Sequence, residues 1–165
     1  IGGTHELLHN DILQQLVHKN LEKIGGYTYT SEEKVFAEKI SESLGVSFNT
    51  QYVEGVEPYD KGGKAGGSTD VGDVSFAVPT VGLRAATWVP GTPAHSWQAV
   101  AAGGTDIGNK GMMVAAKTLA LTAMQLIDNP KIISDAKKEF LQKRGDDFKY
   151  VPMLGDRKPA LNYRN

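Results

Sequence analysis

The residues best suited to chemistry in this chain lie between positions 66 and 117. A lone histidine, His95, stands on a short loop rich in proline and glycine, directly after the apolar run 78–89. We predict that this run is a buried strand, and α/β folds keep their chemistry just beyond the carboxyl ends of their strands. Imidazole is the commonest metal ligand in proteins and also transfers protons. His95 is therefore a candidate metal or catalytic residue; the alternative is a loop histidine packed near Trp97.

A second candidate site is the glycine-rich segment 66–70, Gly-Gly-Ser-Thr-Asp, which precedes the apolar run. The hydroxyls of Ser68 and Thr69 can donate hydrogen bonds, and Asp70 adds a carboxylate. Aspartates beside glycine and serine most often form turns and helix caps. A direct catalytic role for Asp70 or Asp73 is therefore the less favoured interpretation.

The glycine-rich segment 103–111 opens a long apolar helix and suggests a phosphate loop. It does not match the pattern Gly-x-x-x-x-Gly-Lys-Ser/Thr, because Asn109 separates Gly108 from Lys110 and Gly111 replaces the hydroxyl residue. We favour a helix start that needs a flexible backbone. A nest of amides that holds an anionic substrate is the alternative.

Residues 5–9 match the zincin pattern His-Glu-x-x-His, in which two histidines one helical turn apart bind zinc and the glutamate activates water. Two glycines precede the motif, no third histidine follows at the metzincin spacing, and the helical pattern begins only after Asn10. As a strand, the segment would place His5 and His9 on one face. We favour a strand end, and a zincin-type metalloprotease is the alternative.

Local signals predict four helices that would position these residues. Asn10 or Asp11 caps the first, which runs to about residue 24, and the capping box of Thr30 and Glu33 opens the second, which ends before Gly45. Residues 46–69 lose all periodicity and are predicted to be a long loop. The third and fourth helices are expected at about 111–128, apolar almost all round, and from 130 to about 144, with a proline at the first position.

Strand-like residues are sparse: the start of the chain, 73–76 and 78–89. Together with the helices they predict an α/β fold, with helices packed on a small sheet and the third helix sandwiched against it. The length of 165 residues suffices for one core, and the net charge of -1 gives no reason to expect nucleic acid or an anionic membrane. No apolar run approaches the roughly 20 residues of a membrane span, and without cysteine there is no thiolate zinc site. A cytoplasmic location is the default expectation.

The block 66–117 resembles the C-terminal part of the metal-dependent amidohydrolase and metallopeptidase family that includes aminoacylase, carboxypeptidase G and peptidase T. The resemblance is carried by 66–70, by Gly-Thr-Pro-Ala-His-Ser-Trp-Gln at 91–98, by Gly-Asn-Lys-Gly-Met at 108–112 and by Ala-Ala-Lys at 115–117. In that family a smaller dimerisation domain interrupts a three-layer, zinc-peptidase-like α/β catalytic domain. The resemblance implies that residues 1–9 end a dimerisation-domain strand and that 10–165 form the C-terminal portion of the catalytic domain.

The same resemblance implies a site with two divalent ions, zinc or manganese, whose last histidine ligand maps to His95. Gly67, Ser68, Thr69 and Asp70 would line the substrate pocket. The family's His-x-Asp ligand pair, bridging aspartate and Glu-Glu catalytic pair match no segment here, so we expect a fragment with no catalytic residue of its own that is inactive alone. Residues 46–69 also lack the arginine that related exopeptidases use to clamp a carboxylate.

The implied activity is metal-dependent hydrolysis of the amide bond of an aminobenzoyl-glutamate-like or N-acyl amino acid substrate. The implied assembly is a homodimer or a heterodimer with a related subunit. Two other classes are kept open: the zincin-type metalloprotease and a noncatalytic α/β interaction module, which would show no metal dependence.

Overall fold

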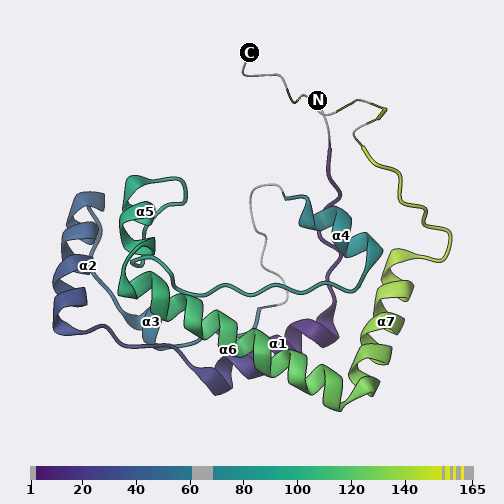
Figure 1. Ribbon diagram of the computed structural model, residues 1–165, viewed down its shortest axis with the longest axis horizontal. Helices are drawn as coiled ribbons and strands as arrows, with labels where there is room; N and C mark the ends of the chain where they lie inside the picture. The colour runs from purple at the N-terminus through teal and green to yellow at the C-terminus, as the bar shows by residue number, and fades with distance from the viewer. Residues whose placement is uncertain (1–2, 61–68, 154, 157, 159–160, 162–165) are drawn as a thin grey trace.

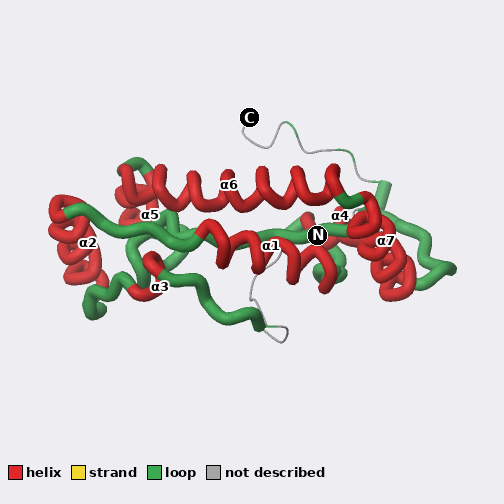
Figure 2. Tube along the Cα trace, turned by 90° about the horizontal axis from the view of Figure 1, so that it is seen from below, coloured by secondary structure: helices red, strands yellow, loops and turns green. Residues whose placement is uncertain are grey.

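The computed structural model describes residues 3–60, 69–153, 155–156, 158 and 161. These residues form seven helices: α1 (Asp11–Ile24), α2 (Ser31–Leu44), α3 (Gln51–Glu54), α4 (Val71–Ala77), α5 (Trp97–Gly103), α6 (Asp106–Asp128) and α7 (Pro130–Arg144). In Figure 1, α2, α3 and α5 gather at one end of the long axis and α4 and α7 at the other. Helices α1 and α6 lie along one another between the two ends (Figure 2).

The predicted α/β fold with a small sheet is wrong for the part of the chain that the structure describes, because no residue in it forms a strand. The strand expected at 73–76 lies inside α4. Segments 3–9 and 78–89 are neither helical nor paired as strands with described residues. An apolar extended run becomes a strand only when a second backbone supplies its hydrogen-bonding partners, and the sequence pattern does not reveal whether one is present.

Helix α4 forms where a strand was predicted because its small residues share one helical face. Gly72 and Ser75 are three positions apart and both are buried against the N-terminal segment. A side chain at Gly72 would overlap the carbonyl of His5. The Ser75 hydroxyl accepts a hydrogen bond from the amide of Leu8 at 2.8 Å. This close backbone contact fits helical spacing, whereas a strand would place the two residues on opposite faces.

The helix boundaries follow the local signals. The Asn10 side chain accepts from the amide of Leu13 at 3.1 Å, and Thr30 and Glu33 form both hydrogen bonds of the capping box. Pro130 occupies the start of α7, as predicted. The third predicted helix begins at Asp106, earlier than the expected start near residue 111. No helix in the described part of the chain is both long and apolar enough to cross a membrane.

One face of α6 packs on α1, where the buried Asn20 amide donates to Thr122 Oγ1 at 3.0 Å and Gln125 Oε1 at 2.7 Å. The extended segment 78–89 crosses α6 at Gly111, where any side chain would overlap the carbonyl of Ala86. Another face of α6 carries exposed apolar residues, so among the described residues this helix is not sandwiched as predicted. They are Met112, Met113, Leu119, Met124 and Ile127.

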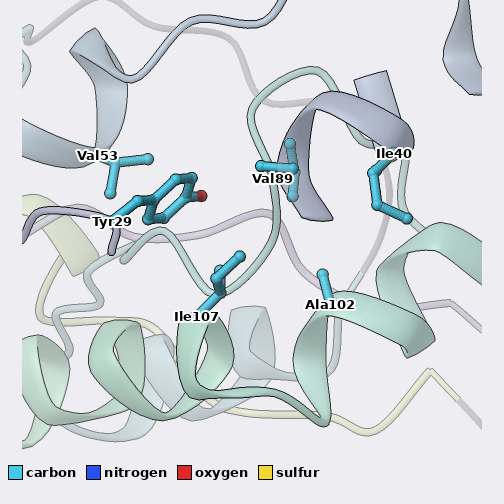
Figure 3. Close-up of a cluster of buried hydrophobic side chains, with 7 residues drawn as sticks. Tyr29, Ile40, Val53, Val89, Ala102 and Ile107 are labelled. Carbon is cyan, nitrogen blue, oxygen red and sulfur yellow. The ribbon is translucent and has the colours of Figure 1, made fainter. Parts of the chain in front are cut away.

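A cluster of buried apolar side chains fills the end of the molecule that holds α2, α3 and α5 (Figure 3). Tyr27 ties the extended segment 78–89 to this end, since its hydroxyl lies 2.6 Å from the Ala86 carbonyl oxygen and 3.0 Å from that of Ile107. Burial, reinforced by Tyr29 and Glu33, raises the pKa of Tyr27 above its ordinary value, so the hydroxyl remains a donor. The cluster comprises Tyr29, Ala37, Ile40, Val53, Val89, Ala102 and Ile107.

Candidate functional site around His95

His95 lies on a loop that the core holds at its base. Val89, which precedes the loop, is 1% exposed and belongs to the buried cluster. The amide of Thr92 donates to the Val89 carbonyl at 3.1 Å, and Gly91 takes a positive φ of 85° in this turn. The loop therefore starts from a fixed point, and His95 itself is exposed.

The backbone of His95 is in the left-handed region, with φ 60°. No other non-glycine residue in the described part of the chain has a positive φ. This conformation costs a residue with a Cβ about 1–2 kcal/mol, although histidine tolerates it better than most. Such outliers cluster at binding and active sites, where the surrounding structure maintains them.

Ser96 fixes the other end of the loop. Its hydroxyl donates to the Pro93 carbonyl at 2.7 Å and accepts from the amide of Ala99 at 3.2 Å, so it caps α5. Helix α5 was not predicted from the sequence. Ser96, an N-cap residue type, followed by an alanine-rich stretch was an available signal, but a seven-residue helix presents too few turns for periodicity to detect.

Two tryptophans stand with His95 around a surface hollow of about 530 Å³. They are Trp88 and Trp97, the two tryptophans of the chain. Trp88 is 37% exposed and Trp97 is 63% exposed. The remaining lining residues are Ser96, Ala99 and Val100. From the sequence, Trp97 was considered only as a packing neighbour of His95, and Trp88 and Val100 were not identified.

The structure does not bring the other predicted site residues to His95. Thr69 and Asp70 are exposed at the start of α4, which lies at the opposite end of the molecule from α5 in both views (Figures 1 and 2). Thr69 Oγ1 accepts from the amide of Val71 at 3.3 Å, a local turn contact. Gly67 and Ser68 lie outside the described residues. Their assignment to a substrate pocket stays a prediction.

The zincin interpretation of residues 5–9 is wrong, because the segment is not helical and its histidines are not one helical turn apart. His5 instead packs against the ring of Phe76, with centroids 4.8 Å apart. Its Nε2 lies 4.0 Å from Asp73 Oδ1. These contacts join the N-terminal segment to α4, so the structure gives His5 a packing role.

The glycine-rich segment 103–111 also proves structural. Gly108 lies so close to the Gly103 carbonyl that a side chain would overlap it, and Gly111 makes the equivalent contact with Ala86. Lys110 Nζ lies 2.6 Å from Glu33 Oε2 and donates to the Thr28 carbonyl at 3.1 Å. The glycines thus permit close packing, and the lysine links α6 to the start of α2.

Among the described residues, no three or more histidine, aspartate or glutamate side chains come together in a way that would hold a metal ion. The His95 imidazole is therefore an isolated group in this part of the chain. An exposed neutral imidazole can supply one ligand to a metal or transfer a proton. A complete metal site requires further ligands, typically three or four from the protein for zinc.

Two known proteins are similar in sequence to this chain. One is the B-type subunit of the p-aminobenzoyl-glutamate hydrolase of Escherichia coli (strain K12), which is 31% identical over 160 residues that cover 82% of this chain and 33% of that protein. The other is the Xaa-Arg dipeptidase of Mus musculus, which is 38% identical over 76 residues, 45% of this chain and 17% of that protein. No family model matches the chain, and no solved structure matches it significantly.

The chain spans about a third of the length of the hydrolase subunit that it matches over most of its own residues. Both similar proteins bear the names of enzymes, one a hydrolase and one a dipeptidase. The resemblance carried by the block 66–117 is confirmed by the first match: the chain belongs to the amidohydrolase and peptidase family of aminoacylase, carboxypeptidase G and peptidase T.

Proposed function

We propose that this chain is part of an enzyme that hydrolyses the amide bond of an aminobenzoyl-glutamate-like or N-acyl amino acid substrate. The observation that carries the proposal is the 31% identity to the p-aminobenzoyl-glutamate hydrolase subunit over 82% of the chain. The hollow around His95 supports it, because it offers an exposed imidazole beside an apolar surface large enough for part of a small molecule.

The resemblance implies a divalent ion, zinc or manganese, and the described residues fit only one part of such a site. His95 offers one exposed imidazole, and the described residues place no cluster of carboxylates or further histidines beside it. We assign to this chain one ligand, His95, and assign the remaining ligands of two ions to residues outside the described part. On this assignment the chain holds no complete catalytic site by itself.

We also propose that the enzyme assembles as a homodimer or as a heterodimer with a related subunit. The similar Escherichia coli protein is named as a subunit of its hydrolase, which supports this assembly. Sedimentation of the intact enzyme, alone and mixed with a candidate partner, checks it. A purely monomeric, active enzyme would contradict it.

The test of the function is the release of p-aminobenzoate from p-aminobenzoyl-glutamate by the intact metal-loaded enzyme, with N-acetyl-glutamate as the N-acyl comparison. We expect hydrolysis of at least one substrate, loss of activity with a chelator and recovery with zinc or manganese. A pure, folded enzyme that cleaves neither substrate would refute the proposal and favour a noncatalytic interaction module.

A further inference from the structure

We propose that Trp88 and Trp97 form an aromatic subsite beside His95, which binds the planar acyl group of the substrate rather than its amino acid part. This inference rests on the proposed function and names the substrate class that the same site selects. Its physical basis is the 530 Å³ hollow, which both indole rings line together with the imidazole.

The two indoles are displayed by neighbours that the core holds in place. Val89 is 1% exposed, and because successive side chains of an extended backbone point to opposite sides, its burial leaves Trp88 at the surface. On α5, Ala99 and Ala102 are 6% and 0% exposed, while Trp97 is 63% exposed. Both tryptophans thus stand on fixed backbone, and neither is itself part of the core.

Leaving these rings exposed has a cost that a ligand can recover. A buried tryptophan removes roughly 150–250 Å² from water, and a paired aromatic ring adds about 0.5–1.5 kcal/mol in favourable geometry. Val100, close to one turn after Trp97, is 78% exposed and extends the same apolar surface. The contiguous surface suits a flat apolar group.

The charge of the hollow decides which part of the substrate it takes. Its lining contains no lysine or arginine among the described residues, and its polar side chains besides the indoles are His95 and Ser96. A glutamate product group carries carboxylates, which arginine or lysine normally pairs. An aromatic acyl ring needs no such partner. The volume also lies within the roughly 300–1,000 Å³ typical of ligand pockets, so the hollow accommodates a benzoyl group.

The decisive experiment compares Trp97→Leu with Trp97→Phe in the intact enzyme on two substrates, p-aminobenzoyl-glutamate and N-acetyl-glutamate. We expect Trp97→Leu to raise KM for the aromatic substrate about tenfold with little change in kcat, because a stacking contact of this size is lost. The KM for N-acetyl-glutamate should stay within about twofold. Trp97→Phe should retain most of the preference.

Tyr52→Leu is the matched control, since Tyr52 is an exposed aromatic residue on α3 that does not line the hollow. It should leave both KM values unchanged. Equal loss on the aromatic and acetyl substrates in Trp97→Leu would overturn the subsite, as would no loss on either. An indole surface found buried by another polypeptide in the intact enzyme would overturn it too.

Isothermal titration with benzoate and cyclohexanecarboxylate separates this inference from the proposed function. The subsite predicts saturable binding of benzoate in the millimolar range, weaker binding of cyclohexanecarboxylate, and loss of the difference in Trp97→Leu. Benzoate binding that depends on Trp97 in an enzyme without hydrolase activity would support the subsite and refute the function. Hydrolysis without any aromatic preference in either assay would do the reverse.

Discussion

At the scale of single residues, His95 combines an exposed imidazole with a left-handed backbone between two fixed points, Val89 and the Ser96 cap. The loop holds the side chain without burying it. The role proposed for His95 can therefore be tested with little damage to the fold, provided that the substitute residue tolerates a φ of 60°.

His95→Asn is the preferred substitution, because asparagine is one of the residues that adopt the left-handed region most readily. In the intact enzyme we expect bound metal to fall and kcat/KM to drop at least on the order of 10²-fold, since even groups that only support metal ligands are worth about 10 to 100-fold. The free energy of unfolding should change by less than about 1 kcal/mol. Metal analysis and thermal unfolding measure the two effects.

His95→Ala serves as the comparison for backbone strain. It should lose metal and activity equally but unfold at a somewhat lower temperature, because alanine adopts this φ at a cost of about 1–2 kcal/mol. Full metal occupancy and normal turnover in either variant would remove His95 from the site.

His5 and His9 give a second prediction at this scale. Because residues 3–9 are not helical, the pair cannot form a zincin site. Replacing both with alanine in the intact enzyme should leave the metal content unchanged, while the loss of the His5 contact with Phe76 lowers stability by about 1 kcal/mol. Stoichiometric metal loss would restore the zincin interpretation.

At the scale of helices, α1 and α7 are joined through the carboxylate of Glu139. Its two oxygens accept from the amides of Asp11 and Ile12 at 2.8 Å and 3.0 Å, so a residue of α7 caps the start of α1. Lys143 Nζ lies 2.6 Å from the same carboxylate. Burial raises the pKa of Glu139, but the hydrogen bonds from Lys143 and the two amides outweigh it, and the pKa is lowered below its ordinary value.

This arrangement predicts how stability depends on pH. A lowered folded-state pKa means that folding favours the carboxylate, so its contribution is complete above the ordinary value of 4.5 and disappears as the pH falls through the lower, folded value. Glu139→Gln should cost about 1–2 kcal/mol at neutral pH and flatten the acid side of the stability curve. Denaturant unfolding at several pH values measures both effects.

The control for Glu139→Gln is Asp135→Asn on the same helix. Asp135 lies 2.6 Å from Lys131 in an exposed pair at spacing i, i+4. Such surface pairs contribute at most about 0.5 kcal/mol. If the two substitutions cost the same, the carboxylate of Glu139 does not act as a cap.

At the scale of the whole molecule, the extended segment 78–89 links the two ends and crosses α6 at very close range. Gly111→Ala places a Cβ against the carbonyl of Ala86, and backbone cannot give way as a flexible side chain does. We expect a loss of about 1–3 kcal/mol in the free energy of unfolding. Gly82→Ala, with nothing within 4 Å of the added carbon, should be nearly neutral. Similar unfolding midpoints for both variants would contradict the crossing.

A metal titration tests the chain as a whole. With one isolated imidazole in the hollow and no ligand cluster among the described residues, this chain alone should show no tight stoichiometric site for zinc or manganese. Isothermal titration provides the measurement. A submicromolar site in the isolated chain would mean that His95 is not the partial ligand proposed here.

The helices with strong local signals could be predicted without any knowledge of the fold. The caps at Asn10 and Thr30 and the proline at position 130 lie at helix starts that the structure confirms. These signals depend on contacts within about four residues, so the sequence contains them in full. The sequence also carried the family resemblance, and it singled out His95 as the candidate ligand.

The unpaired state of the extended segments and the surroundings of His95 became visible only in the folded chain. Segment 78–89 is apolar enough for a strand, but no described residue provides the second backbone that a ladder requires. Trp88 joins His95 because burial of Val89 fixes the side of the chain on which the indole lies. Thr69 and Asp70, which were expected in the same site as the histidine, lie at the far end of the molecule (Figure 1). Strand pairing and the proximity of side chains depend on segments far apart in the chain, and local sequence patterns do not encode them.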